Sequence, residues 1–149
     1  MSFWNFFKKF SKEKKSGSST ETQEIQMFIE NQRKEIESIE KFLNKLSPYQ
    51  NPETLNMTLE EFIKYLENQA KPMQENMVKE KDSLKIKELY EKLADIDLIK
   101  SFIYTYISYS RSELYDLQEI TEKTTLSSFI SILKERKNKI KEILSLNIK

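Results

Sequence analysis

Closely spaced carboxylates are the first residues in this sequence whose types and spacing suggest chemistry. They are Glu35, Glu37 and Glu40, then Glu60 and Glu61, then Asp95 and Asp97. Two carboxylates that flank a cleft serve acid–base hydrolysis of glycosides, whereas a di-iron site in a helix bundle also needs histidine. The sequence contains no histidine. We therefore expect these carboxylates to lie on solvated helix faces.

Other residue types that are common in catalytic sites are missing from the sequence. The sequence has neither histidine nor cysteine, and Gly17 is its one glycine. Without these residues the usual general base, the thiolate nucleophile and the common zinc ligands are absent. A single glycine also excludes the phosphate-binding loops and the nucleophile elbow. We expect no enzymatic activity, no bound metal and no cofactor.

Two groups of residues in the second half of the chain, one of tyrosines and one of basic residues, are of the types that contact nucleic acid or phosphate. Tyr104, Tyr106 and Tyr109 have only Lys100 and Arg111 as basic neighbours, and stacking on bases needs a basic groove. Residues 134–141 carry five basic side chains, namely Lys134, Arg136, Lys137, Lys139 and Lys141. We expect the tyrosines to pack in a core or interface. We expect the basic run to form the solvent face of the last helix, and nucleic acid is not an expected partner.

The first fifteen residues carry the sharpest signal. Half of the first ten residues are aromatic, and five lysines accompany or follow them. These residues are Phe3, Trp4, Phe6, Phe7, Lys8, Lys9, Phe10, Lys12, Lys14 and Lys15. On a helix the five aromatic side chains fall within roughly 160° of arc. Residues 1–15 therefore predict a short amphipathic helix with an aromatic face and a basic tail.

An aromatic face of this size needs a surface to cover. The alternatives are an anionic membrane interface, a groove of a partner protein or second copy, and the chain's own bundle. Tryptophan and phenylalanine beside lysine are typical of the lipid headgroup boundary, which favours the membrane. The apolar stretch is too short for a membrane span, and its positive charges follow it, unlike those of a secretory signal. We expect a cytoplasmic protein attached peripherally at the inner membrane face.

The rest of the chain predicts an all-α fold. Beyond Pro72 there is neither glycine nor proline, and sheet proteins of this size need many turns built from such residues. Residues 16–21 predict a flexible linker and residues 22–149 a bundle domain of four to five helices. Residues 16–149 hold 20 of the 25 basic and 23 of the 24 acidic side chains, so this part is slightly acidic.

Apolar periodicity divides the bundle into helices. A stripe broken only by Gln32 predicts a first helix over 22–46, which ends before Pro48 and is suited to self-association. Thr58 and Glu61 predict a capping box for a second helix, which should end at Lys71, before Pro72. Its expected buried face is Leu59, Phe62, Ile63, Leu66 and Ala70.

Two further helices follow. Asp82 or Ser83 predicts the start of the third, and Thr124 or Thr125 the start of the last. The expected inner face of the last helix is Leu126, Phe129, Ile130, Leu133, Ile140, Ile143 and Leu144. Residues 102–109 have the local preferences of a strand. Because no second such run exists to pair with them, we interpret them as buried helix.

These observations predict a non-enzymatic helical adaptor or scaffold. We expect it to attach peripherally to an anionic membrane surface through residues 1–15. The alternative is a soluble assembly subunit whose aromatic N-terminus docks into a groove of a partner protein or self-associates.

Overall fold

The chain folds as an all-α bundle, as its composition predicts. The computed structural model describes residues 19–147, which form five α-helices and two short 3-10 helices with no strand among them. The elements are α2 (Ser19–Leu46), η2 (Ser47–Tyr49), α3 (Pro52–Leu55), α4 (Leu59–Lys79), α5 (Ser83–Ser110), η3 (Glu113–Tyr115) and α6 (Leu126–Asn147). The predicted amphipathic helix in residues 1–15 lies outside the described residues.

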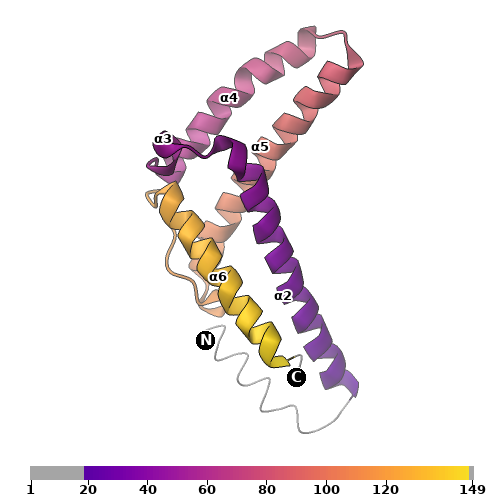
Figure 1. Cartoon of the computed structure of the whole chain (residues 1–149), viewed down its shortest axis with the longest axis vertical. Coiled ribbons are helices and arrows are strands. Elements are labelled where there is room, and N and C mark those ends of the chain that lie inside the picture. The colour runs from indigo at the N-terminus through magenta and orange to yellow at the C-terminus, as the bar shows by residue number, and fades with distance from the viewer. Residues whose placement is uncertain (1–18, 148–149) are drawn as a thin grey trace.

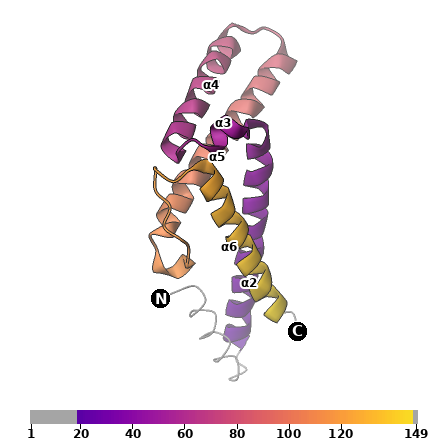
Figure 2. The same cartoon turned by 60° about the vertical axis from the view of Figure 1, so that its left-hand side comes forward.

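The long helix α5 belongs to both parts of the fold, the body of the bundle and a projecting hairpin. Its C-terminal half lies with α2 and α6 in the body of the bundle, and its N-terminal half pairs with α4 in a hairpin that extends beyond the other helices (Figure 1, Figure 2). The last buried residue of α4 is Ala70 and the first of α5 is Ile96. Val78 and Leu84 are largely exposed at the hairpin tip. The tip is therefore a two-helix projection without a core of its own.

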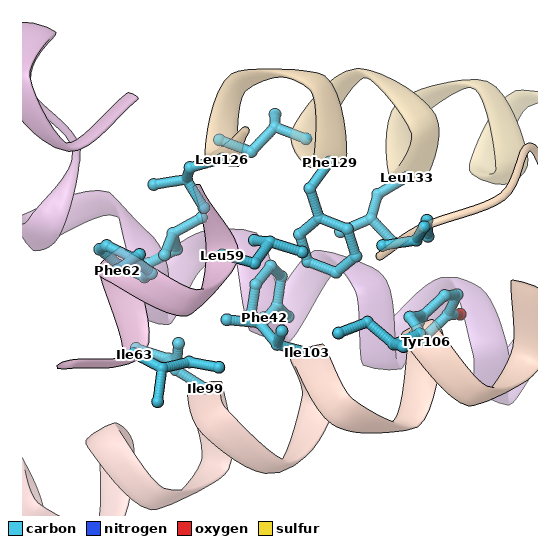
Figure 3. Packing of buried hydrophobic residues seen from close by; sticks show 14 of the residues in the cluster. Phe42, Leu59, Phe62, Ile63, Ile99, Ile103, Tyr106, Leu126, Phe129 and Leu133 are labelled. Atoms are coloured by element: carbon cyan, nitrogen blue, oxygen red, sulfur yellow. The ribbon is translucent and has the colours of Figure 1, made fainter. Parts of the chain in front are cut away.

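The core lies where α2, α4, α5 and α6 meet. Phe42 from α2 stands between Phe102 of α5, with ring centroids 4.1 Å apart, and Phe129 of α6, at 5.7 Å. Figure 3 shows Phe42 and Phe129 facing each other among aliphatic side chains of α4, α5 and α6. The five residues expected on the inner face of α4 are buried, and so are the seven expected on that of α6. Periodicity therefore predicted both buried faces correctly.

The predicted helix caps are also present. The Thr58 hydroxyl accepts a hydrogen bond from the Glu61 backbone at 3.2 Å, and the Glu61 carboxylate accepts one from the Thr58 backbone at 3.1 Å. These bonds lower the pKa of Glu61. Asp82 caps α5 by accepting from the Leu84 backbone at 3.0 Å. Each cap satisfies amide groups that the first helical turn leaves unpaired.

A short backbone pairing joins the starts of α4 and α6, and the sequence did not predict it. The Leu59 amide donates to the Thr124 carbonyl at 2.8 Å, and the Leu126 amide donates to the Met57 carbonyl at 2.9 Å. These bonds hold together the N-termini of two helices that are far apart in sequence.

Two predicted boundaries are wrong. α2 begins at Ser19, so the last three residues of the predicted linker 16–21 are helical. α4 runs through Pro72 to Lys79 instead of ending at Lys71. A proline inside a helix removes one hydrogen bond and costs about 3 kcal/mol. The helix continues because Met73, beyond the proline, packs against the core cluster.

Residues 102–109 are helical, as their isolation in the sequence predicts. Within them Ile103, Tyr106 and Ile107 are buried, whereas Tyr104 is exposed. Burial on one helical face offsets the intrinsic strand preference of β-branched and aromatic residues.

Candidate functional site: a groove between α2 and α5

An open groove runs between α2 and the C-terminal half of α5. We call it the α2–α5 groove; its volume is about 950 Å³. α2 contributes side chains from Glu24 to Lys41, α5 contributes Leu98 to Tyr109, and Leu114, Tyr115 and Arg136 complete the lining. Met27 and Leu114 are more than half exposed although both are apolar. The groove therefore offers apolar surface that the described residues leave uncovered.

A row of aromatic rings lies along the groove. Phe102 and Tyr106 stack with centroids 4.6 Å apart, and Tyr109 stacks on Tyr115 at 4.1 Å with nearly parallel rings. Phe102, Tyr106 and Tyr109 are spaced by four and three residues, which places them on one face of α5. Such rings give a ligand rigid apolar contacts with little loss of side-chain entropy.

A buried ion pair lies at one side of the groove. Arg136 donates two hydrogen bonds to Glu35, from Nε to Oε2 at 2.7 Å and from Nη2 to Oε1 at 3.0 Å. Arg136 Nη1 donates to the Tyr115 carbonyl at 2.6 Å, and the Tyr106 hydroxyl donates to Glu35 Oε2 at 3.0 Å. Four elements, α2, α5, η3 and α6, are thus joined by hydrogen bonds to the Glu35–Arg136 ion pair.

The burial of this pair indicates a structural role. The Arg136 side chain is 1% exposed and the Glu35 side chain 14%. Burial, followed by the charge of Glu35, raises the pKa of Tyr106 far above its ordinary value. Tyr106 therefore stays a neutral donor, and arginine does not release its proton in proteins. The network clamps helices together and offers no group poised for proton transfer.

Gln32 is the polar residue that interrupts the apolar stripe of α2, and it lines the groove. Its side chain is buried, and among residues 19–147 its Oε1 atom has no hydrogen-bond partner. A buried acceptor without a donor costs about 1–3 kcal/mol. Gln32 is therefore an unsatisfied polar residue in the wall of the groove.

The structure corrects two predictions about charged residues. Arg136 was expected on the solvent face of the last helix, and Glu35 on a solvated face of the first; both are wrong, because each neutralises the other in the interior. Lys134, Lys139 and Lys141 are exposed as predicted, and Lys137 reaches Glu40 at 3.4 Å. The predicted membrane- or partner-binding residues, Phe3 to Lys15, lie outside the described residues.

The described residues show no arrangement for a metal or a membrane span. Within residues 19–147, no three acidic, histidine or cysteine side chains gather in a way that would hold a metal ion. In the same range no helix has the length and apolar character needed to cross a bilayer.

Three tyrosines are predicted to ionise at a higher pH in the folded protein than in the unfolded chain: Tyr106 and Tyr115 at the groove, and Tyr49 outside it. Burial raises the pKa of Tyr49 and Tyr106, and burial together with a hydrogen bond to Tyr109 raises the pKa of Tyr115 to about 12. The unfolded chain ionises these groups near pH 10. Their contribution to stability is therefore complete below pH 10 and is lost as the pH rises through the folded-state values.

An alkaline absorbance titration checks this prediction. The folded protein should show a delayed tyrosinate phase that the protein in denaturant lacks, and Tyr106→Phe should reduce its amplitude. A single phase at the same pH in folded and unfolded protein would contradict the prediction.

No protein-family model, curated protein or solved structure matches this chain.

Proposed function

We propose that the protein is a non-enzymatic helical adaptor or scaffold that attaches peripherally to an anionic membrane surface through residues 1–15. One observation carries the proposal: five aromatic residues and five lysines, against one glutamate, are concentrated in this short segment. Aromatic rings beside lysines suit the boundary between lipid headgroups and acyl chains.

The described bundle supports separate roles for residues 1–15 and for the helical bundle. Within residues 19–147, the central core cluster is built by side chains from Ile39 to Leu133. A body that keeps its fold without the segment leaves residues 1–15 available for a surface. The projecting α4–α5 hairpin, with Val78, Leu84 and Tyr90 exposed, is then a surface for the partner that the adaptor brings to the membrane.

The energetics favour reversible attachment. Full burial of a large apolar side chain is worth about 1.5–3 kcal/mol, and interfacial burial achieves part of that. Each lysine close to an anionic leaflet adds about 1 kcal/mol. Ordering the backbone opposes these gains by roughly 1–2 kcal/mol per residue. The small difference predicts binding that depends on anionic lipid and weakens with salt.

Replacing Trp4 and Phe7 with alanine should detach the protein from anionic liposomes while leaving the bundle folded. The measurement is co-sedimentation at low and high salt, with circular dichroism to verify the fold. The matched control is Val78→Ala with Tyr90→Ala, which removes two exposed apolar side chains from the hairpin tip. This control should sediment like the unaltered chain.

Two outcomes contradict the proposal. In one, the unaltered chain stays in the supernatant with anionic liposomes at low salt. In the other, a chain lacking residues 1–15 sediments as well as the full chain.

The α2–α5 groove favours a second candidate, a soluble assembly subunit. A groove with an aromatic floor and exposed apolar edges suits the aromatic face of an amphipathic helix from a second copy or a partner protein. Self-association through helix 22–46 is a further form of this proposal. Sedimentation velocity over a range of concentrations, with and without residues 1–15, tests it: a dimer that requires the segment supports docking between copies.

A further inference from the structure

We propose that the α2–α5 groove is the docking site for residues 3–10 of the same chain. The described helix α2 begins at Ser19, and the α2 lining of the groove starts only five residues later, at Glu24. The segment that precedes α2 is thus tethered beside one end of the groove. Its own aromatic side chains match the apolar surface that Met27 and Leu114 leave uncovered there.

The length of the segment agrees with the length of the groove along α2. As a helix, residues 3–10 span about 12 Å, and the stretch of α2 from Glu24 to Gln32 also spans about 12 Å at 1.5 Å per residue. Residues 11–18 reach up to about 26–29 Å when extended. They need to cover only about 8 Å along α2 to place residue 10 beside Glu24. The segment can therefore turn back and run antiparallel to α2.

This register places Trp4 near Gln32. With Phe10 beside Glu24, an antiparallel helix places Trp4 beside Glu30, about 3 Å along the axis from Gln32 at 1.5 Å per residue. Among residues 19–147, the Gln32 Oε1 atom is buried without a hydrogen-bond partner. The indole N–H of tryptophan is a donor without an acceptor. Trp4 therefore brings an apolar ring to the groove, and a side-chain rotation of Gln32 is needed before its oxygen can accept from the indole.

The charges are complementary. Residues 1–15 hold five lysines and one glutamate, whereas the stretch of α2 from Glu24 to Gln32 holds two glutamates and no basic side chain. Glu24 and Glu30 are exposed on the stretch of α2 concerned. Since Lys8 and Lys9 lie opposite the aromatic face of the segment, docking leaves their charges in solvent near these carboxylates.

Docking would hold back membrane attachment. The same five aromatic side chains cannot face the groove and a lipid surface at once, so the two sites compete for the segment. A tethered segment meets its groove at a high effective concentration, and only the undocked fraction is competent to bind lipid. This consequence rests on the proposed membrane attachment, whereas docking itself does not.

Trp4 reports directly on docking because it is the one tryptophan of the sequence. The experiment measures its emission and its quenching by acrylamide in the full-length protein without lipid. A peptide of residues 1–18 is the reference for the free segment. We expect blue-shifted emission and severalfold weaker quenching in the protein than in the peptide, unchanged on dilution.

Two double variants locate the contact. Met27→Lys with Leu114→Lys places charges on the groove edges, and Val78→Lys with Leu84→Lys makes the same kind of change at the hairpin tip; all four positions are exposed. The groove variant should show the emission and quenching of the free peptide. The tip variant should keep the values of the unaltered protein.

Three results overturn the inference. In the first, Trp4 emission is the same in the full chain and in the peptide. In the second, Trp4 stays protected from acrylamide in the groove variant, and in the third this protection is lost on dilution, which means that the segment docks into the groove of a second copy.

Binding to anionic liposomes distinguishes the docking proposal from the proposed membrane attachment. The groove variant should bind more at limiting lipid than the tip variant, which carries the same added charge. If no variant binds liposomes while Trp4 protection is lost only in the groove variant, docking stands and membrane attachment fails.

Discussion

Replacing Arg136 with alanine is expected to lower the free energy of unfolding by about 3–5 kcal/mol, the usual cost of removing one partner from a buried ion pair. The substitution leaves Glu35 charged in a largely buried position and removes the donor of the Tyr115 carbonyl. It also separates α6 from α2 and η3, which the guanidinium group connects. The measurement is chemical denaturation followed by circular dichroism.

Lys137→Ala is the matched control for this prediction. Lys137 is the next residue of α6 and also contacts a glutamate of α2, Glu40, but this pair is partly exposed. A pair of this kind is worth about 0–1 kcal/mol. Replacing both Glu35 and Arg136 with methionine should recover part of the loss, because no buried charge then remains unpaired, while the Tyr106 hydroxyl and the Tyr115 carbonyl lose their partners. Equal effects of Arg136→Ala and Lys137→Ala would contradict the interpretation of a buried clamp.

Replacing Phe42 with alanine is expected to cost about 3–5 kcal/mol of unfolding free energy, as large core truncations do. The Phe42 side chain is fully buried, and its ring contacts Phe102 and Phe129 from two other helices. The cavity would lie where α2, α5 and α6 converge, so none of the three helices can close it by a local shift.

Thermal or urea denaturation measures this loss. Phe42→Leu, which keeps part of the volume, should cost clearly less than Phe42→Ala. Leu84→Ala at the exposed hairpin tip should change the free energy of unfolding by less than about 0.5 kcal/mol. If Phe42→Ala is as mild as Leu84→Ala, the aromatic cluster does not hold the bundle together.

The fold class, the buried helix faces and the helix caps follow from local patterns in the amino-acid sequence. Apolar residues at helical spacing predicted the inner faces of α4 and α6, and Thr58 with Glu61 predicted the start of α4. Both are local signals, since the geometry of one helix decides which side chains share a face and which group reaches the first free amide. The concentration of aromatic residues and lysines in residues 1–15 is likewise readable from sequence alone.

The ion pair and the groove, in contrast, depend on how the helices pack against one another. Glu35 and Arg136 are separated by 101 residues, and each looks like an ordinary surface charge within its own helix. Gln32 was visible as a break in a stripe, but its lack of a partner depends on how α2 and α5 meet. Pro72 lies inside α4, where the next residue, Met73, packs against the core cluster. In each case the stabilising contacts come from residues that are distant in sequence. Helix propensity describes single residues in their own helix, so it cannot predict such contacts.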